Sequence, residues 1–231
     1  MFYLNSSYLM YMLPALLLMM LTQWYVNSSY KKYSQVSARS GLTGAQAAQR
    51  LISSSGLYQV KIETVRGNLT DHYDPRSKTL RLSAGVAQSP SVAALAISAH
   101  ELGHAMQDAE NYFPLRLRAA LVPAVNIGSY LGWILIFIGL MLRMTDLAWL
   151  GVLVFAGGAV FALATLPVEL NASARAKQLL ANTGMIIGEE ERQGVNRVLN
   201  AAALTYVAGL VTAIMQLLYF VSLVGGSGRR R

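Results

Sequence analysis

Four long apolar stretches constrain this chain more than any other feature of its sequence. They cover Leu9–Val26, Ala119–Leu142, Leu147–Leu166 and about Ala202–Val224. Each is close to the roughly 20 residues that an α-helix needs to cross a bilayer core of about 30 Å. Only 13% of the 231 residues are charged, against roughly 25% in an ordinary soluble domain. We therefore predict about four transmembrane helices and exclude a purely soluble protein.

These stretches divide the chain into five parts. Residues 1–26 are predicted to be an N-terminal transmembrane anchor, because no basic residue precedes the apolar core and no clear cleavage site follows it. Residues 119–166 are predicted to form a transmembrane hairpin, and 202–231 a last transmembrane helix with a basic tail. Residues 27–118 and 167–201 are more polar and lie between the membrane spans.

The basic residues predict the orientation in the membrane. Four spans place 27–118 and 167–201 on one face, with 15 Lys and Arg residues against four on the other face. The positive-inside rule then places both polar segments in the cytoplasm of a multi-pass plasma-membrane protein. The run Arg229–Arg231 does not fit this orientation. We interpret the net charge of +8 as a topology signal, so the expected partner is the lipid bilayer and no nucleic acid. A homo-oligomer is left open.

The predicted spans also carry small residues at four-residue spacing, which allows helix backbones to approach closely. The pairs are Gly128 with Gly132, Gly158 with Ala162, and Gly209 with Ala213.

Residues 27–118 show a mixed α and β pattern. Thr43 is typical of an N-cap, and a helix is predicted from there through Leu51 to near Gly56. Alternating residues predict strands over Tyr58–Glu63 and Thr79–Ser83. We interpret the intervening residues as turns and loops.

Further helices are predicted before the second apolar stretch and after the third. Ser89 as N-cap and Pro90 at the first helical position predict a helix that Pro114 limits. In the second polar segment, a helix is predicted over Ala172–Ala181, and another begins at Gly188 and continues into the fourth span.

The most informative residues form the sequence His100-Glu-Leu-Gly-His104. On an α-helix, His100 and His104 lie one turn apart on the same face, where both imidazoles can bind one metal ion. Glu101 projects beside them and can take a proton from a metal-bound water. Zinc suits these ligands, and a chain without cysteine has no thiolate alternative. The competing interpretation is a chance match on a helix without metal.

A catalytic zinc needs a third protein ligand. Glu110 stands where the metzincin pattern has its ligand, but Gln107 replaces the glycine that turns that chain back. His72 is another candidate, and Asp108 is too far along the helix. We favour Glu169, because two spans return the chain to the face that holds the histidines.

The motif residues resemble a known family. His100–Gln107, Asp71–Ser77, Leu80–Ser83 and Leu166–Ser173 are similar to the bacterial membrane-bound neutral zinc metallopeptidases of the YugP type. The resemblance extends from the first span to the last. It implies peptidase chemistry with Zn²⁺ in a bacterial inner membrane.

A more distant resemblance concerns the third ligand. Glu169-x-x-Ala172 resembles the second motif of the HtpX and CAAX-protease gluzincins, in which the Glu binds zinc and a following Asp orients a ligand histidine. Ser173 stands at the position of that Asp. The resemblance therefore implies that Asn171 or Ser173 supports the histidine instead.

These observations predict a mechanism of peptide hydrolysis by metal-activated water. Glu101 would take the proton of the water and pass it to the leaving amine. His72 and Arg175 are candidates to stabilise the oxyanion, although His72 could be a turn residue and Arg175 an ion-paired one. A free edge of Thr79–Ser83 would hold an extended substrate.

The predicted fold class is a mainly α membrane protein, with about four transmembrane helices and a small α+β zincin-like cytoplasmic lobe that carries the HExxH helix. Expected substrates are peptides or proteins, membrane-associated because His104 and Glu169 lie close to spans. The alternative is a non-catalytic zinc-binding membrane scaffold or partner-binding subunit. An intramembrane protease is disfavoured because Val92–Ala99 is too short to cross a bilayer. A transporter is disfavoured because no acidic or histidine residue lies mid-span.

Overall fold

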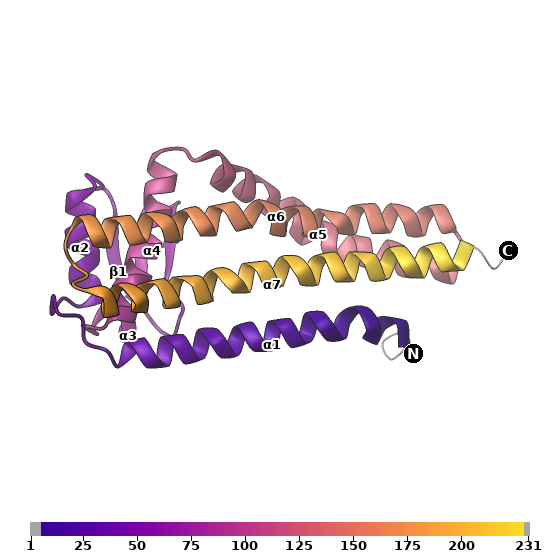
Figure 1. Ribbon diagram of the computed structural model, residues 1–231. Coiled ribbons are helices and arrows are strands. Elements are labelled where there is room, and N and C mark those ends of the chain that lie inside the picture. The colour runs from indigo at the N-terminus through magenta and orange to yellow at the C-terminus, as the bar shows by residue number, and fades with distance from the viewer. Residues whose placement is uncertain (1–5, 229–231) are drawn as a thin grey trace. The chain divides into compact units, whose positions relative to one another are not determined.

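The computed structural model describes residues 6–228 and is mainly helical (Figure 1). Four of its helices are long and apolar enough to cross a membrane: α1 (Ser6–Ser34), α5 (Phe113–Met141), α6 (Thr145–Asn182) and α7 (Glu189–Gly228). The predicted class of a mainly α membrane protein with a small α+β lobe is confirmed. The basic run Arg229–Arg231 lies outside the described residues.

The chain forms two compact units. One contains the chain up to Thr22, Arg116–Pro167 and the chain from Thr205 onward, and we call it the membrane unit. The other contains Gln23–Leu115 and Val168–Leu204, and we call it the lobe. The boundaries fall inside long helices, so α1, α5, α6 and α7 each contribute residues to both units.

Helix α6 corrects one prediction. The helix expected over Ala172–Ala181 is not separate, because α6 runs without a break from Thr145 through Pro167 to Asn182. A proline inside a helix removes one hydrogen bond and crowds the preceding turn, but helices that cross a membrane tolerate such a proline. Helix α7 begins with three acidic residues and continues into the fourth span, as predicted.

The lobe contains a three-stranded sheet of β1 (Lys61–Val65), β2 (His72–Asp74) and β3 (Thr79–Ser83). The strand order is β1-β3-β2, with β1 parallel and β2 antiparallel to β3. The strand over Thr79–Ser83 is confirmed. It is the central strand, however, and both of its edges are paired. The prediction that its free edge holds a substrate is therefore wrong.

Two local predictions about strands also need correction. The first strand begins at Lys61 and not at Tyr58, because residues 58–59 form a turn that leaves Tyr58 exposed. The segment Asp71–Asp74, interpreted as a loop, contains β2. Its pairing with β3 depends on a partner in another segment of the chain, which a short polar segment does not reveal by itself.

Three helices belong wholly to the lobe: α2 (Gly44–Ser54), α3 (Ala84–Ala87) and α4 (Val92–Ala109). Thr43 caps α2 as predicted, in a capping box with Gln46. The N-cap of α4 is Ser91 and not Ser89, because the Ser91 side chain accepts the N–H of Ala94. Pro90 precedes that helix, and its carbonyl oxygen accepts the N–H of Ala38 instead.

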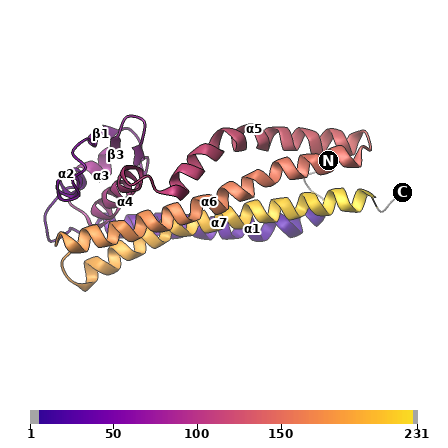
Figure 2. The same ribbon diagram turned by 90° about the horizontal axis from the view of Figure 1, so that it is seen from above.

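The core of the lobe surrounds α4, whose first turns are almost fully buried. Figure 2 shows α2, α3 and α4 beside β1 and β3. The largest apolar side chains of this core are Leu51, Leu80, Leu82, Leu95, Leu102, Leu180 and Leu199. Between them α4 contributes mainly alanines, so neighbouring elements approach its backbone closely. A helix buried on this scale holds its functional side chains in fixed positions.

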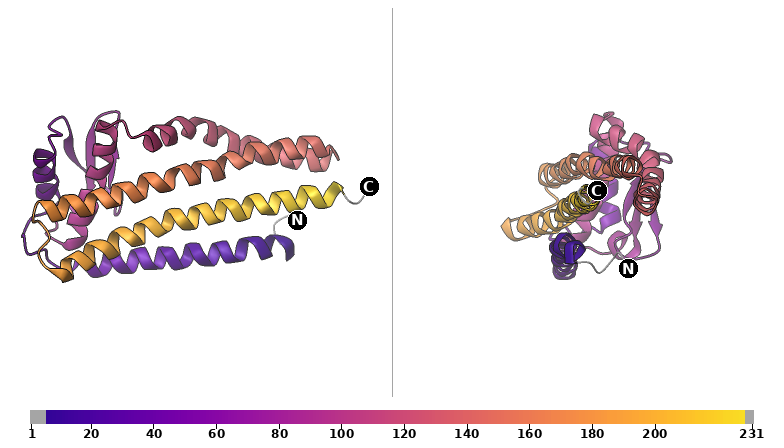
Figure 3. Two further views of the ribbon diagram at one scale, coloured as in Figure 1. Left: turned by 45° about the horizontal axis from the view of Figure 1, so that its top comes forward. Right: turned by 90° about the vertical axis from the view of Figure 1, so that its right-hand side faces the viewer.

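In the membrane unit, α5 and α6 form a hairpin whose two helices lie side by side (Figure 3). A methyl group added at Gly139 would lie 2.5 Å from the backbone nitrogen of Ala148. One added at Gly132 would lie 2.9 Å from the backbone nitrogen of Phe155. Gly132 was among the predicted contact residues, whereas a methyl group added at Gly209, another predicted contact residue, would meet no other part of the chain within 4 Å. Glycine spacing alone therefore identified only part of the contact.

Candidate metal centre

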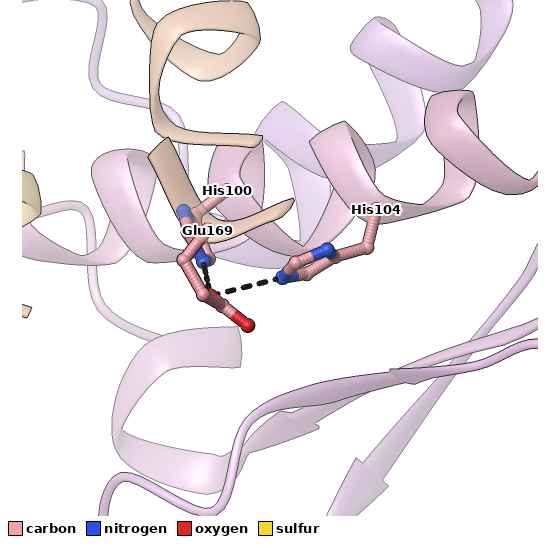
Figure 4. A group of neighbouring side chains, drawn as sticks. All are labelled: His100, His104 and Glu169. Atoms are coloured by element: carbon pink, nitrogen blue, oxygen red, sulfur yellow. Dashed lines mark ion pairs between the residues drawn. The ribbon is translucent and has the colours of Figure 1, made fainter. Parts of the chain in front are cut away.

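Three side chains with metal-binding atoms meet where α4 and α6 lie together in the lobe. The Nε2 atoms of His100 and His104 lie 3.3 and 3.5 Å from Glu169 Oε2. The ligand atoms of the three residues all lie within 4.8 Å of one another. Figure 4 shows both imidazole rings directed from α4 toward the Glu169 carboxylate. The structure thus brings together the three residues that the sequence analysis named as ligands.

Gly103 allows the two helices to approach closely enough for this arrangement. A methyl group added at Gly103 would lie 2.6 Å from the carbonyl oxygen of Ala172. Gly103 stands between the two histidines, and Ala172 follows Glu169 by three residues. Because a Cβ atom does not fit, only glycine permits α6 to lie so close to the HExxH turn of α4.

Glu101 lies on α4 between the two histidines and is half-buried. Strand β2 of the sheet donates a hydrogen bond to its carboxylate. Its Oε2 atom accepts the backbone N–H of Tyr73 at 3.0 Å. Burial raises the pKa of Glu101, and the charge of Glu169 acts in the same direction, while the two histidines oppose the shift. The carboxyl group is therefore well placed to exchange a proton with a group bound near the histidines.

Tyr73 attaches β2 to α4 at a second point, because its hydroxyl donates to Asp108 Oδ2 at 2.8 Å. Burial and this hydrogen bond raise the pKa of Tyr73. The sequence analysis assigned no role to Tyr73. Its position becomes apparent only when β2 is known to pair with β3 and to contact α4.

The far nitrogen of each histidine has its own partner. Ser173 Oγ lies 3.2 Å from His100 Nδ1. Gln107 Oε1 lies 3.0 Å from His104 Nδ1. Asn171 reaches neither histidine directly, and its Oδ1 atom accepts a hydrogen bond from Gln107 Nε2. The sequence analysis considered Gln107 only because it replaces the glycine of the metzincin pattern. Its spacing of three residues from His104 nevertheless places both side chains on the same helix face.

The other two charged candidates bind each other. The Arg175 guanidinium forms two hydrogen bonds with the Glu110 carboxylate, at 2.7 and 2.6 Å. Arg175 lowers the pKa of Glu110 through these contacts. Arg175 Nε donates to Asn171 Oδ1 at 2.8 Å. Neither residue belongs to the group of metal-binding atoms.

His72 is exposed on β2 and also lies outside this group. Its Nδ1 atom lies 2.8 Å from the carbonyl oxygen of Thr70.

The three clustered residues fit a zinc ion. Two imidazole nitrogens and one carboxylate oxygen form a donor set that zinc accepts in catalytic sites. Glu169 is almost fully buried, with 1% of its surface exposed. A buried carboxylate is costly unless positive charge lies beside it, and a cation bound between the three ligands would supply that charge.

Four apolar helices together with a histidine-histidine-glutamate cluster define the class of membrane zinc metallopeptidases. Comparison with known proteins agrees. The family described as "Putative neutral zinc metallopeptidase" matches residues 8–225, and the chain belongs to this family. The protein named "Putative membrane protease YugP" from Bacillus subtilis (strain 168) is 47% identical over 199 residues, which cover 86% of this chain and 88% of that protein. No solved structure matches the chain.

The resemblance inferred from the motifs is thereby confirmed, and zinc is the metal that this family implies.

Proposed function

We propose that this protein is a membrane-embedded zinc endopeptidase of the gluzincin type. The observation that carries the proposal is the meeting of His100 Nε2, His104 Nε2 and the Glu169 carboxylate within 4.8 Å of one another. Glu101, on the same helix, stands beside this group. Two histidines and a carboxylate from a second helix are the ligand set of zinc peptidases such as thermolysin.

Each residue has a distinct role in the proposed reaction. His100, His104 and Glu169 hold the zinc. When bound, zinc supplies a water of lowered pKa and polarises the carbonyl of the peptide bond. Glu101 takes the proton of the attacking water and passes it to the leaving amine. The Tyr73 N–H holds one oxygen of the Glu101 carboxylate and leaves the other to carry the proton.

Of the two residues considered for the oxyanion, His72 stays a prediction. We assign Arg175 a different role, because its Nε and both terminal nitrogens are engaged by Asn171 and Glu110. Three of its five N–H donors are engaged in these contacts, which hold the guanidinium against Glu110 and Asn171 and not toward a developing negative charge at the metal cluster.

The proposed substrates are membrane-associated proteins or their tails, cut at the cytoplasmic face of the bacterial inner membrane. The distribution of Lys and Arg supports this orientation, with 15 in the segments that flank the site and four elsewhere. Glu169 lies within α6, just after its apolar part, and His104 lies nine residues before α5 begins, which supports a site near the lipid headgroups.

Zinc content tests the ligand set directly. We expect about one zinc per chain, measured by elemental analysis, in wild-type protein purified in detergent, and a clear loss in Glu169→Ala. Glu190→Ala is the matched control, because Glu190 is an exposed glutamate in the first turn of α7. Full zinc retention in Glu169→Ala would overturn the gluzincin site and shift the third ligand to His72 or Glu110.

The alternative function is a non-catalytic scaffold that keeps zinc for structure. A structural zinc site normally has four protein ligands and no open position. Among the residues that the structure describes, the clustered group has three, which favours the peptidase.

A further inference from the structure

Gln107 is the most deeply buried polar side chain beside the site and has no role in the mechanism above. None of its surface is exposed. It makes three hydrogen bonds: to His104 Nδ1 at 3.0 Å, to the carbonyl oxygen of Val168 at 2.8 Å and to Asn171 Oδ1 at 2.9 Å. A buried amide is costly unless it is paired, so this arrangement has to be satisfied as a whole.

The chemistry of the partners fixes the orientation of the amide. The carbonyl oxygen of Val168 can only accept a hydrogen bond, so the Gln107 nitrogen has to face it. The Gln107 oxygen then has to face His104 Nδ1. Because this oxygen can only accept, the proton of that hydrogen bond belongs to His104.

At the other end of this hydrogen-bond network, Arg175 fixes the orientation of the Asn171 amide. Arg175 Nε can only donate, so the oxygen of Asn171 has to face it. The same oxygen accepts the second N–H of Gln107. Glu110 holds the Arg175 guanidinium with two hydrogen bonds. The donor and the acceptor of every hydrogen bond between Arg175 and His104 are therefore determined.

We propose that Gln107, Asn171 and Arg175 form a relay that fixes the tautomer of His104. The proton stays on Nδ1, and the lone pair of Nε2 is presented to the metal. The three are positioning residues, because they act on the metal site through His104. This inference rests on the proposed function only in taking His104 as a zinc ligand.

The two ligand histidines differ in this respect. The partner of His100 is the hydroxyl of Ser173, which can donate or accept and so fixes no tautomer. His104 Nδ1 lies 3.0 Å from the Gln107 oxygen, closer than its Nε2 lies to Glu169 Oε2 at 3.5 Å, so we expect the Nδ1 tautomer at His104 in the zinc-free protein. His100 Nε2 lies 3.3 Å from Glu169 Oε2, and Ser173 does not hold a proton on its Nδ1, so we expect no such preference for Nδ1 at His100.

Nitrogen NMR of zinc-free protein tests the relay without requiring zinc or activity. The chain has three histidines, so ¹⁵N-histidine labelling in detergent micelles gives few signals, which His72→Gln and His100→Gln assign. At a pH where the rings are neutral, we expect His104 to carry its proton on Nδ1 in the wild type. In Gln107→Met, which has similar volume and no amide, we expect both tautomers of His104 to be present.

Zinc affinity, measured by competition with a chelator, is the second measurement. We expect Gln107→Met to weaken zinc binding by about 10–100-fold, as is typical when the partner of a ligand histidine is lost. Asn171→Asp keeps an acceptor for both Gln107 and Arg175, so we expect near-normal tautomer and affinity. Asn171→Leu removes the acceptor, and we expect it to behave like Gln107→Met. Gln49→Met, at an exposed position on α2, is the control.

The Asn171 pair keeps the test decisive if Gln107→Met does not fold. The relay is overturned if wild-type His104 carries its proton on Nε2, or if Asn171→Leu leaves the tautomer and affinity unchanged. If Glu169→Ala retained zinc while Asn171→Leu still altered the His104 tautomer, the proposed ligand set would fail and the relay would stand.

Discussion

Helix α6 makes two close contacts through glycine, one in each unit of the molecule. In the lobe, Gly103 of α4 allows the backbone of Ala172 to approach. In the membrane unit, a methyl group added at Gly151 of α6 would lie 2.6 Å from the backbone nitrogen of Ile136 of α5. The same device brings helix backbones together in both places, but the side chains that flank it differ completely.

Polar side chains lie near Gly103, and each has a defined partner: Gln107 binds Val168 and Asn171, and Ser173 contacts His100. The side chains beside the α5–α6 contact are apolar, such as Ile136 and Val152. Polar atoms brought into a buried contact have to be paired, whereas apolar contacts need only shape. A substitution that disturbs the Gly103 contact should therefore change zinc binding or catalysis. A substitution that disturbs the α5–α6 contact should change stability alone.

The largest expected effect separates chemistry from packing within the lobe. Glu101→Gln removes the proton acceptor and keeps the shape of the side chain. We expect the rate of β-casein cleavage in detergent to fall by about 10²–10⁴-fold, the usual contribution of a general base. Zinc content should be unchanged, because Glu101 is not in the ligand cluster. Glu190→Gln is the control, and equal activity in Glu101→Gln would favour the scaffold.

Matched glycine variants test the comparison itself. Gly103→Ala should push α6 away from the histidines, so we expect zinc affinity to fall by at least about tenfold. Gly139→Ala should force the α5–α6 hairpin apart and lower the free energy of unfolding by about 1–3 kcal/mol, with zinc affinity unchanged. Chelator competition and thermal unfolding in the same detergent measure both effects. A loss of zinc in Gly139→Ala equal to that in Gly103→Ala would break the comparison.

The pH dependence of zinc binding should reveal the polar character of the lobe contact. Burial alone would lower the pKa of His104, but the hydrogen bond to Glu169 and the charges of Glu101 and Glu169 outweigh burial and raise it. Protons therefore compete with zinc up to a higher pH than for a free imidazole. Below the raised pKa we expect zinc affinity to fall by about tenfold per pH unit for this group.

The zinc-free protein should show the opposite trend in stability. A pKa raised by folding stabilises the folded state below the unfolded value of about 6.5, and this stabilisation is lost as the pH rises through the folded pKa. We therefore expect zinc-free protein to melt at a lower temperature at pH 9 than at pH 6, and His104→Gln to lose much of this difference. An unchanged difference in His104→Gln would assign the effect to other groups.

The lobe also shows which parts of the site could be predicted from the sequence. His100, Glu101 and His104 follow from helical periodicity, because their relation is local. Glu169 required the count of membrane spans and a resemblance, because it lies 65 residues after His104. Gln107 and Tyr73 were missed, since their partners are Val168, Asn171 and Glu101, which only the packed lobe brings near.

The fold was predictable to a similar extent. Hydropathy identified the four long helices, because an uncharged run of about 20 apolar residues is typical of a helix that crosses a bilayer. It did not show that α6 continues through Pro167, since a proline inside a helical pattern usually ends or kinks the helix. Strand order could not be predicted from local sequence patterns either, because β3 is central only through its pairing with both other strands.

The smallest expected effect concerns the attachment of β2 to α4. Tyr73→Phe removes the hydroxyl that donates to Asp108 and keeps the backbone N–H that holds Glu101. We expect a loss of about 0.5–1.5 kcal/mol in the free energy of unfolding, the usual net contribution of one hydrogen bond. Zinc content and cleavage should stay near the wild-type values, because the contact with Glu101 is made by the main chain. A large loss of activity in Tyr73→Phe would mean that the hydroxyl, and not only the backbone of β2, determines the position of Glu101.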